Sequence, residues 1–244
     1  MSAYDFVRKL LRMHIDMIGF DADDTLWHTE PLYSVTEAKF MSLLSTGHAR
    51  ADIEARLYQT EIRNLEHFGY GIKGFILSMI ETAIELSGGN ITGSEIQQII
   101  DYAREMLRAP VDLLAHVAET VEVLAASHKL MLITKGDLFD QESKVARSGL
   151  AQHFAHVEVV SEKDKATYQA VLRKRGIDPA GFLMVGNSLR SDVLPVLELG
   201  GQAVHIPYST TWVHETLHEP VDAARYHELA HMGLLAEYVE SLRR

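Results

Sequence analysis

The feature that most constrains this chain is a short apolar segment that runs directly into two acids. Residues 15–20 (Ile-Asp-Met-Ile-Gly-Phe) have the composition of a buried strand, and Asp21 and Asp23 follow at once. Carboxylates crowded at the end of a buried strand are costly, because like charges a few ångströms apart resist joint ionisation. A divalent cation that held the acids together would offset this cost, and one acid could then do covalent work.

From about residue 115 onward, strand-like and helical patterns alternate. The expected strands are Leu130–Ile133, Val157–Val160, Phe182–Val185 and Ala203–Ile206, and the expected helices are Glu119–Ala126, Asp140–Ser148, Thr167–Arg175 and Asp192–Leu199. Such alternation predicts an α/β fold with a doubly wound, parallel, Rossmann-like sheet that is covered on both faces. Residues 15–20 must belong to the same sheet, because an isolated strand cannot satisfy its backbone hydrogen bonds.

Between these two parts, residues 31–110 have an almost entirely helical period. Breaks are expected at Gly47, at Gly69–Gly71 and at Gly88–Asn90. One expected helix covers Ala51–Phe68. Another covers Ser94–Arg108, with Thr92 or Ser94 as its cap. The simplest organisation is a core formed by residues 1–28 and 112–244, with an all-helical cap, residues 29–111, inserted after the first strand.

Polar side chains follow each predicted strand at the point where it ends. Asp21 and Asp23 follow the first strand, and the later ends carry Thr134-Lys135-Gly136, Ser161-Glu162-Lys163 and Gly186-Asn187-Ser188, with Asp192 shortly after. In open parallel sheets, functional groups gather beyond the carboxyl ends of the strands. We therefore expect these residues to face one crevice.

These four motifs, in this order and on these element ends, resemble those of the haloacid dehalogenase-like hydrolase superfamily, whose members are mostly phosphatases. The resemblance covers the whole chain and includes a helical cap after the first motif. It implies that Asp21 is the nucleophile, which becomes an aspartyl phosphate, and that Asp23 is the general acid and then the base. The presence of Asp23 favours phosphoryl transfer, because a haloacid dehalogenase has no use for this second acid.

The same resemblance implies the remaining roles. Thr134 and Lys163 would bind the non-bridging phosphate oxygens. From their position in the second motif, Gly136 would supply a backbone N–H to the phosphate, and Lys135 would either contact the phosphate or be solvated. Mg²⁺ would be held by Asp21, the carbonyl group of Asp23, Asn187 and Asp192. Such phosphatases usually carry Asp where this chain has Asn187, so one negative charge is lost and weaker magnesium binding is expected. Lys165 and Lys144 are alternatives to Lys163, because the usual Lys-Pro pair is absent.

Charge and composition exclude several functions. The chain has 34 acidic and 23 basic residues, a formal net charge of −11, which disfavours nucleic acid and anionic membranes as partners. It contains no cysteine, so thiolate metal sites are excluded. No apolar run reaches the ~18 residues of a membrane span, and the start lacks the apolar core of a signal peptide. We expect a soluble cytoplasmic protein that binds a small phosphorylated metabolite, in an oligomeric state that the sequence leaves open.

Other functions remain as alternatives to a small-molecule phosphatase. A phosphomutase or phosphotransferase would use the same intermediate, and Asn187 suggests a non-catalytic protein that binds a phosphorylated ligand. Two segments, His214–His218 and His227–His231, each fit His-Glu-x-x-His, a zinc metallopeptidase signature. No third zinc ligand is evident after His231, so an exposed helical tail is the favoured interpretation of this region.

Overall fold

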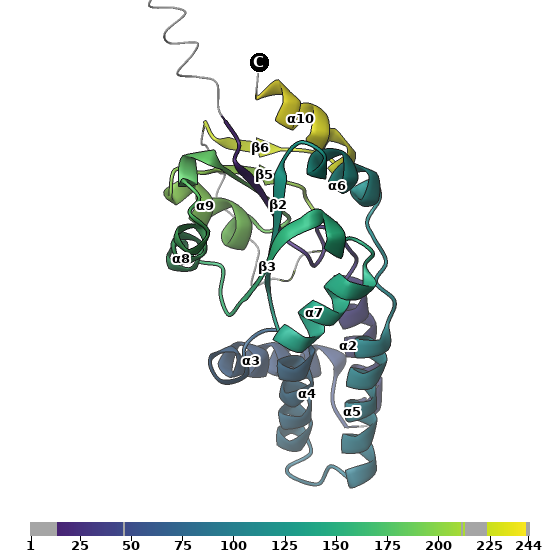
Figure 1. The fold of residues 1–244 in the computed structure, drawn as a ribbon. Coiled ribbons are helices and arrows are strands. Elements are labelled where there is room, and N and C mark those ends of the chain that lie inside the picture. Colours follow the sequence, from purple (N-terminus) through teal and green to yellow (C-terminus); the bar gives the residue numbers. More distant parts are fainter. Residues whose placement is uncertain (1–13, 46, 211, 213–223, 243–244) are drawn as a thin grey trace, which may run out of the picture. The chain divides into compact units, whose positions relative to one another are not determined.

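The computed structural model describes residues 14–45, 47–210, 212 and 224–242. They form two compact units (Figure 1). Of the described residues, the first unit takes in those up to His28, Asp112–Thr134 and those from Ser148 onward, and the second takes in those within Thr29–Val111 and Lys135–Arg147. Among the described residues, no helix is both long and apolar enough to cross a membrane.

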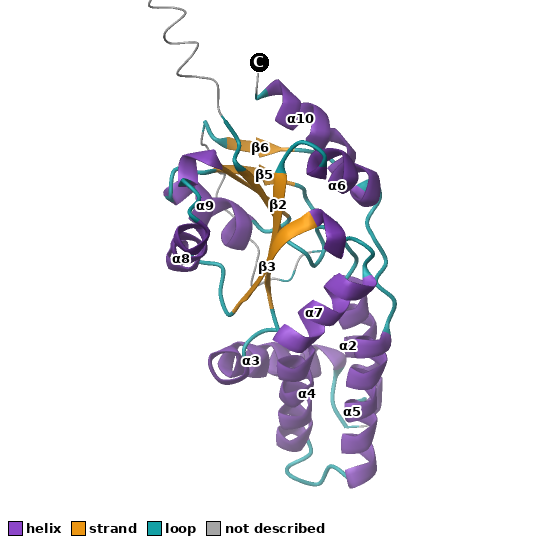
Figure 2. Ribbon diagram, viewed as in Figure 1, coloured by secondary structure: helices purple, strands orange, loops and turns teal. Residues whose placement is uncertain are grey.

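The first unit is built on a six-stranded sheet with the strand order β3-β2-β1-β4-β5-β6. Figure 2 draws its strands in orange. Its strands are β1 (Met17–Phe20), β2 (Lys129–Lys135), β3 (Phe154–Val160), β4 (Phe182–Gly186), β5 (Gln202–His205) and β6 (Tyr226–Glu228). Strand β1 pairs in parallel with both β2 and β4, and β4–β5 and β5–β6 are also parallel. The α/β fold with a parallel sheet that the sequence predicts is confirmed.

The register of the strands brings their carboxyl ends together. Phe20, the last residue of β1, pairs with Val185 of β4. Gly186 then pairs with His205 of β5, which pairs in turn with Glu228 of β6. The loops that carry the predicted site residues therefore begin at one edge of the sheet.

The core of the first unit surrounds β1, whose four residues are all buried. Helices α8 (Lys165–Arg175) and α9 (Leu194–Glu198) lie on one side of the sheet, and α6 (Val117–Ala125) and α10 (Leu235–Ser241) lie on the other (Figure 1). Gly19 leaves room for a ring of β4, because a Cβ atom there would lie 2.5 Å from Cζ of Phe182. One buried cluster comprises Met17, Met131, Ile133, Tyr168, Val171, Leu172, Phe182, Met184 and Val196.

The second unit is helical. It contains α2 (Glu30–Leu44), α3 (Arg50–Phe68), α4 (Ile72–Leu86), α5 (Gly93–Arg108) and α7 (Leu138–Arg147). The gaps between the first four of these helices fall at the predicted glycine breaks. The unit includes α7, a segment that the sequence pattern places in the core. The cap as a functional domain, residues 29–111, stays a prediction.

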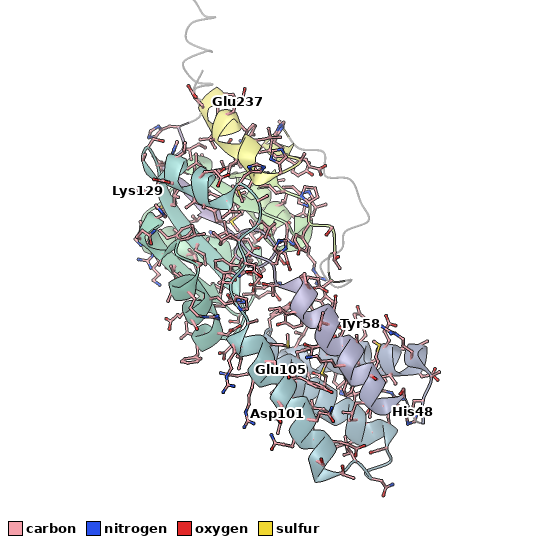
Figure 3. All side chains as sticks on the ribbon, turned by 90° about the vertical axis from the view of Figure 1, so that its right-hand side faces the viewer. His48, Tyr58, Asp101, Glu105, Lys129 and Glu237 are labelled. Atoms are coloured by element: carbon pink, nitrogen blue, oxygen red, sulfur yellow. The ribbon has the colours of Figure 1, made fainter. Side chains whose placement is uncertain are left out.

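Local sequence signals account for the helices of the second unit. Thr92 begins α5 with a capping box, in which its hydroxyl accepts from the backbone N–H of Glu95 and the Glu95 carboxylate accepts from the N–H of Thr92. The apolar face of α5 joins a buried cluster with α2, α3 and α4. Its opposite face carries Asp101 and Glu105, whose side chains are at least half exposed (Figure 3).

The carboxyl-terminal region differs from the predicted helical tail. Residues 226–228 form β6, and after a 3-10 turn (Met232–Leu234) the short helix α10 packs against α6. Burial explains the difference, because Leu229, Met232, Leu235 and Val239 are all buried in the first unit. The segment His214–His218 lies outside the described residues.

Candidate active site

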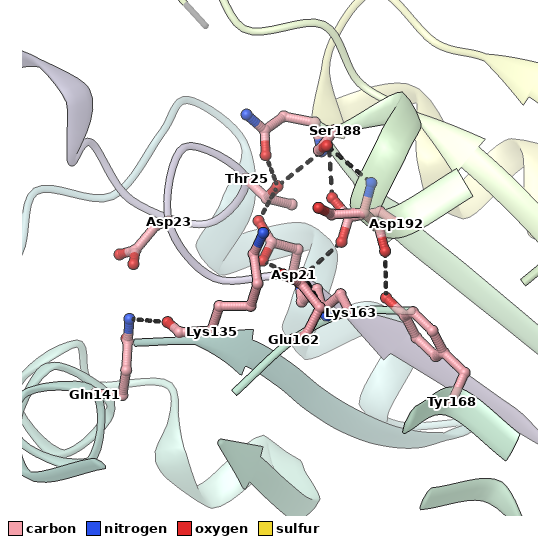
Figure 4. A network of polar contacts seen from close by, with 12 residues as sticks. Asp21, Asp23, Thr25, Lys135, Gln141, Glu162, Lys163, Tyr168, Ser188 and Asp192 are labelled. Carbon is pink, nitrogen blue, oxygen red and sulfur yellow. Dashed lines mark hydrogen bonds and ion pairs between the residues drawn. The ribbon is translucent and has the colours of Figure 1, made fainter. Parts of the chain in front are cut away.

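The centre of the candidate site is a buried ammonium group between two carboxylates. Lys163, in the loop after β3, donates from Nζ to Oδ1 of Asp21 and to Oδ1 of Asp192, the latter at 2.7 Å (Figure 4). The side chains of Lys163, Asp21 and Asp192 are 2%, 10% and 1% exposed. Three residues that are far apart in the sequence and that the motifs predicted are thus in direct contact.

Burial and charge together perturb both members of the central pair. Desolvation raises the pKa of Asp21 to about 7, with Asp192 and Asp23 adding to the rise and Lys163 opposing it. Desolvation alone would lower the pKa of Lys163, but Asp192 and Asp21 outweigh it and raise that pKa well above its ordinary value. Lys163 therefore stays protonated, and the cluster carries an excess of negative charge when both acids are ionised.

Thr25 links the first motif to the fourth. Its Oγ1 donates to Oδ2 of Asp21 at 2.8 Å and also lies 3.2 Å from Oδ1 of Asn187. The same oxygen accepts from the backbone N–H of Asn187 at 3.1 Å. Both carboxylate oxygens of Asp21 are therefore hydrogen-bonded, one by Lys163 and one by Thr25. No role for Thr25 was predicted from the sequence, although its position four residues after Asp21 was the available signal.

Asp23 is held separately from the ammonium cluster. The indole N–H of Trp27 donates to its Oδ1 at 2.8 Å, and the indole is 1% exposed. The turn between them is tight, with the N–H of Leu26 donating to the carbonyl of Ala22 at 2.8 Å. Asp24 adopts a left-handed φ of 60°, a conformation that Asp tolerates better than most residues.

The fourth motif positions Asp192 through a π-helical turn, Leu189–Val193. The backbone N–H of Ser188 donates to Oδ2 of Asp192 at 3.0 Å, so both of its carboxylate oxygens are engaged. Gly186 is required for this approach, because a Cβ atom there would lie 2.2 Å from Oδ2 of Asp192. The carboxylate thus packs directly over the end of β4.

The oxygens beside Asp21 fit a hydrated magnesium ion. Asp21 and Asn187 both contact the hydroxyl of Thr25, so a carboxylate and an amide oxygen lie close together. Magnesium commonly uses one or two carboxylates, with water and substrate phosphate completing its octahedron. Among the described residues, no group of three or more His, Cys, Asp or Glu side chains is placed to hold a metal ion.

The remaining predicted phosphate-binding residues follow β2. Thr134 is 1% exposed, and its strand is the direct neighbour of β1. Lys135 and Gly136 belong to the second unit, where the carbonyl of Lys135 accepts from Nε2 of Gln141 at 2.7 Å (Figure 4). Nζ of Lys135 lies 4.1 Å from the ring centroid of Tyr70.

The two alternative lysines have other partners. Nζ of Lys165 lies 3.6 Å from a carboxylate oxygen of Glu198, and its side chain is more than half exposed. Nζ of Lys144 lies 3.5 Å from Asp140 within the second unit. Lys163 is the member of this set that contacts Asp21.

His205, which was not among the predicted site residues, contacts the backbone of the fourth motif. Nε2 of His205 lies 3.0 Å from the carbonyl oxygen of Asn187, and Nδ1 lies 3.0 Å from a carboxylate oxygen of Glu228. The hydroxyl of Tyr226 donates to the same Glu228 oxygen at 3.0 Å. The signal that could have found His205 was a polar residue at the end of an apolar strand.

These contacts contradict the zinc-peptidase alternative for His227-Glu228-x-x-His231. The signature needs both histidines on one face of a helix, whereas His227 and Glu228 lie in β6. The ring of His227 stacks on Tyr238, with centroids 4.4 Å apart, and the ring of His231 contacts that of His116. Glu228 already accepts from Tyr226 and faces His205.

Comparisons with known proteins agree on one family. A family model described as haloacid dehalogenase-like hydrolase matches residues 15–200. A haloacid dehalogenase-like family hydrolase from Xanthomonas campestris is 44% identical, with a TM-score of 0.84, over 94% of this chain and 92% of that chain. No protein with a curated functional description matches.

Two more distant structures share the fold. A predicted phosphoglycolate phosphatase from Haemophilus somnus is 18% identical (TM-score 0.61; 92% of this chain, 98% of that chain). The L-2-haloacid dehalogenase from Xanthobacter autotrophicus with covalently bound chloropropionic acid is 16% identical (TM-score 0.64; 93% of this chain, 98% of that chain). These names include both phosphatase and dehalogenase, so the fold alone leaves the reaction open.

Proposed function

The chain belongs to the haloacid dehalogenase-like hydrolase family, and from this premise we propose that it hydrolyses phosphate monoesters of small metabolites with magnesium. The observation that supports this most directly is the Asp21 carboxylate, held by Lys163 and Thr25 at the end of β1 with a second acid two residues on. A dehalogenase has no use for Asp23, whereas phosphoryl transfer from an alcohol oxygen needs a general acid.

The proposed reaction has two steps. One oxygen of Asp21 attacks phosphorus, the bond to the leaving oxygen breaks, and that oxygen takes a proton from Asp23. Asp23, now a carboxylate, then takes a proton from water, which attacks the aspartyl phosphate and releases inorganic phosphate and Asp21. Dividing the displacement in this way replaces one difficult step by two easier ones.

The cluster suits the charge that develops during transfer. Two of the three N–H groups of Lys163 contact Asp21 and Asp192, which leaves the third for a phosphoryl oxygen. The buried Thr134 hydroxyl would bind a second oxygen. Magnesium, held by oxygens of Asp21, the Asp23 carbonyl, Asn187 and Asp192, would neutralise phosphate charge and favour the ionised form of Asp21.

The test is the turnover of an aryl phosphate by the purified full chain, with magnesium and with a chelator. We expect turnover in wild type, its loss in Asp21→Asn, and a phosphorylated Asp21 in acid-quenched protein examined by mass spectrometry. Asp178→Asn is the matched control: it makes the same change at the amino end of β4, where Asn can still accept from the N–H of Ala180. Undiminished turnover in Asp21→Asn would refute the proposal.

Further assays distinguish this function from the alternative functions. Halide released from a 2-haloacid, without phosphate released from any ester, would identify a dehalogenase. Phosphate transferred to added sugars in place of water would identify a phosphotransferase. Ligand affinity without turnover at saturating magnesium would identify a binding protein, and Asn187→Asp would then be expected to restore activity. A panel of phosphorylated metabolites, ranked by kcat/KM, would identify the substrate.

A further inference from the structure

The contact between Trp27 and Asp23 is a hydrogen bond to a proposed reacting group that none of the four motifs explains. The indole N–H is a donor only, and it lies 2.8 Å from Oδ1 of Asp23. The ring is 1% exposed, in contrast to the partly exposed carboxylate. Because the Trp27 ring is so deeply buried, the direction in which its N–H points at the Asp23 carboxylate is fixed.

The backbone on either side of the Trp27 ring is also held in place. Its carbonyl accepts from the N–H of Asp24 at 2.8 Å, and Trp27 bridges both Asp23 and Leu113 in strand-like pairs. At the preceding residue, the carbonyl of Leu26 accepts from the N–H of Leu114 at 3.0 Å. The segment is thus fastened to two parts of the first unit, which fixes the backbone of Trp27, and the burial of the ring confines the indole itself.

We propose that Trp27 is a positioning residue for the general acid and base, Asp23. The inference rests on the proposed phosphatase function and deepens it. With the N–H of Trp27 on Oδ1, this oxygen acts as the carbonyl oxygen of the protonated acid, and the transferable proton sits on Oδ2. In the first step this proton moves from Oδ2 to the leaving oxygen as the P–O bond breaks. In the second step, Oδ2 recovers a proton from the attacking water.

The geometry makes a prediction about leaving groups. General acid catalysis contributes roughly 10²–10⁴-fold when the leaving oxygen is basic and little when it is not. Trp27→Phe keeps an apolar ring and removes the N–H donor. In single-turnover experiments with magnesium, we expect release of an alkyl alcohol to slow about 10- to 100-fold. Release of nitrophenol should slow less than about 3-fold, because that leaving group needs no proton.

A double-mutant cycle separates positioning from a general loss of structure. If Trp27 acts through Asp23, Trp27→Phe should slow alkyl phosphate turnover in wild type but change it less than about 2-fold in an Asp23→Ala background. A purely structural role would make the two losses multiply. Equal slowing of alkyl and nitrophenyl esters, or losses that multiply, would overturn the inference while leaving the phosphatase assignment intact. A wild-type protein inert toward every ester would overturn both.

A spectroscopic measurement tests the contact without relying on catalysis. The chain has two tryptophans, so ¹⁵N-labelled protein gives at most two indole signals, and Trp27→Phe assigns one of them. We expect Asp23→Ala, which keeps Trp27 and its packing, to shift this signal and speed its exchange with solvent. An unchanged Trp27 signal in Asp23→Ala would overturn the inference even if Trp27→Phe proved too unstable to assay.

Discussion

Glu61 on α3 provides a quantitative test of how burial shapes the second unit. Burial, reinforced by the neighbouring carboxylates of Glu37 and Glu30, raises the pKa of Glu61 from 4.5 to about 8. The same group ionises near 4.5 in the unfolded chain. Between these two pH values the folded state keeps a proton that the unfolded state has released, so the free energy of unfolding falls as pH rises. Outside this interval the contribution is constant.

The size of the effect follows from the same interval. It spans about 3.5 pH units, and at ~1.4 kcal/mol per unit the upper limit is about 5 kcal/mol. Glu61 is partly exposed, and screening by solvent reduces the expected value to about 2 kcal/mol. Glu61→Gln keeps the shape of the protonated side chain and removes the titration. We therefore expect similar stability for wild type and variant near pH 4.5, and a more stable variant above pH 8.

The assay is urea unfolding followed by far-ultraviolet circular dichroism across this pH range. Glu66→Gln is the matched control, because it removes one carboxylate from the same helix at an exposed position and should change stability by less than about 0.5 kcal/mol. Parallel stability curves for wild type and Glu61→Gln would show that the carboxyl group is solvated, and would refute the reasoning.

Three further predictions concern the site. Lys163→Met should lower the free energy of unfolding by roughly 3–5 kcal/mol in urea titrations and abolish turnover, because two buried carboxylates lose their shared cation. As a control, Lys165→Met at an exposed position should change the free energy of unfolding by less than about 0.5 kcal/mol. An equal loss of stability in the two variants would contradict this prediction. Gly186→Ala should reduce kcat at least ~10-fold, because the added Cβ displaces Asp192, and unaltered kinetics would refute the role of this packing. Asn187→Asp should tighten magnesium binding about 10-fold in calorimetric titrations by adding a negative charge, and unchanged binding would show that Asn187 lies outside the metal site.

The sheet and the centre of the site were predictable because their signals are local. Apolar runs such as Phe182–Val185 identify strands, and the rule that polar groups follow parallel strands brings Asp21, Lys163 and Asp192 together without any knowledge of distances. The glycine breaks located the helices of the second unit for the same reason. Each of these features is indicated by residues that are close together in the sequence, so no knowledge of distant contacts is needed to predict it.

The parts that could not be predicted depend on contacts between distant residues. Strand β6 has only three residues, none of them fully buried, and its histidine and glutamate suggested a helix instead. A polar residue at the end of an apolar strand singles out His205, but no spacing in the sequence indicates its contact with the backbone of Asn187. The link between Trp27 and Asp23 has helical spacing, but it arises in a tight loop whose geometry the sequence did not indicate.

The position of β6 also bears on how far this chain can be shortened. A truncated chain that stopped before Tyr226 would leave outer backbone groups of β5, such as the carbonyl of His205, without their partners, and a bare parallel edge invites pairing with another copy. The cut would also remove Glu228 from beside His205, whose other nitrogen faces the loop that carries Asn187. Removing Glu228 would therefore disturb Asn187 through the hydrogen-bonded path that His205 forms between them. We expect the truncated chain to be both less soluble and less active.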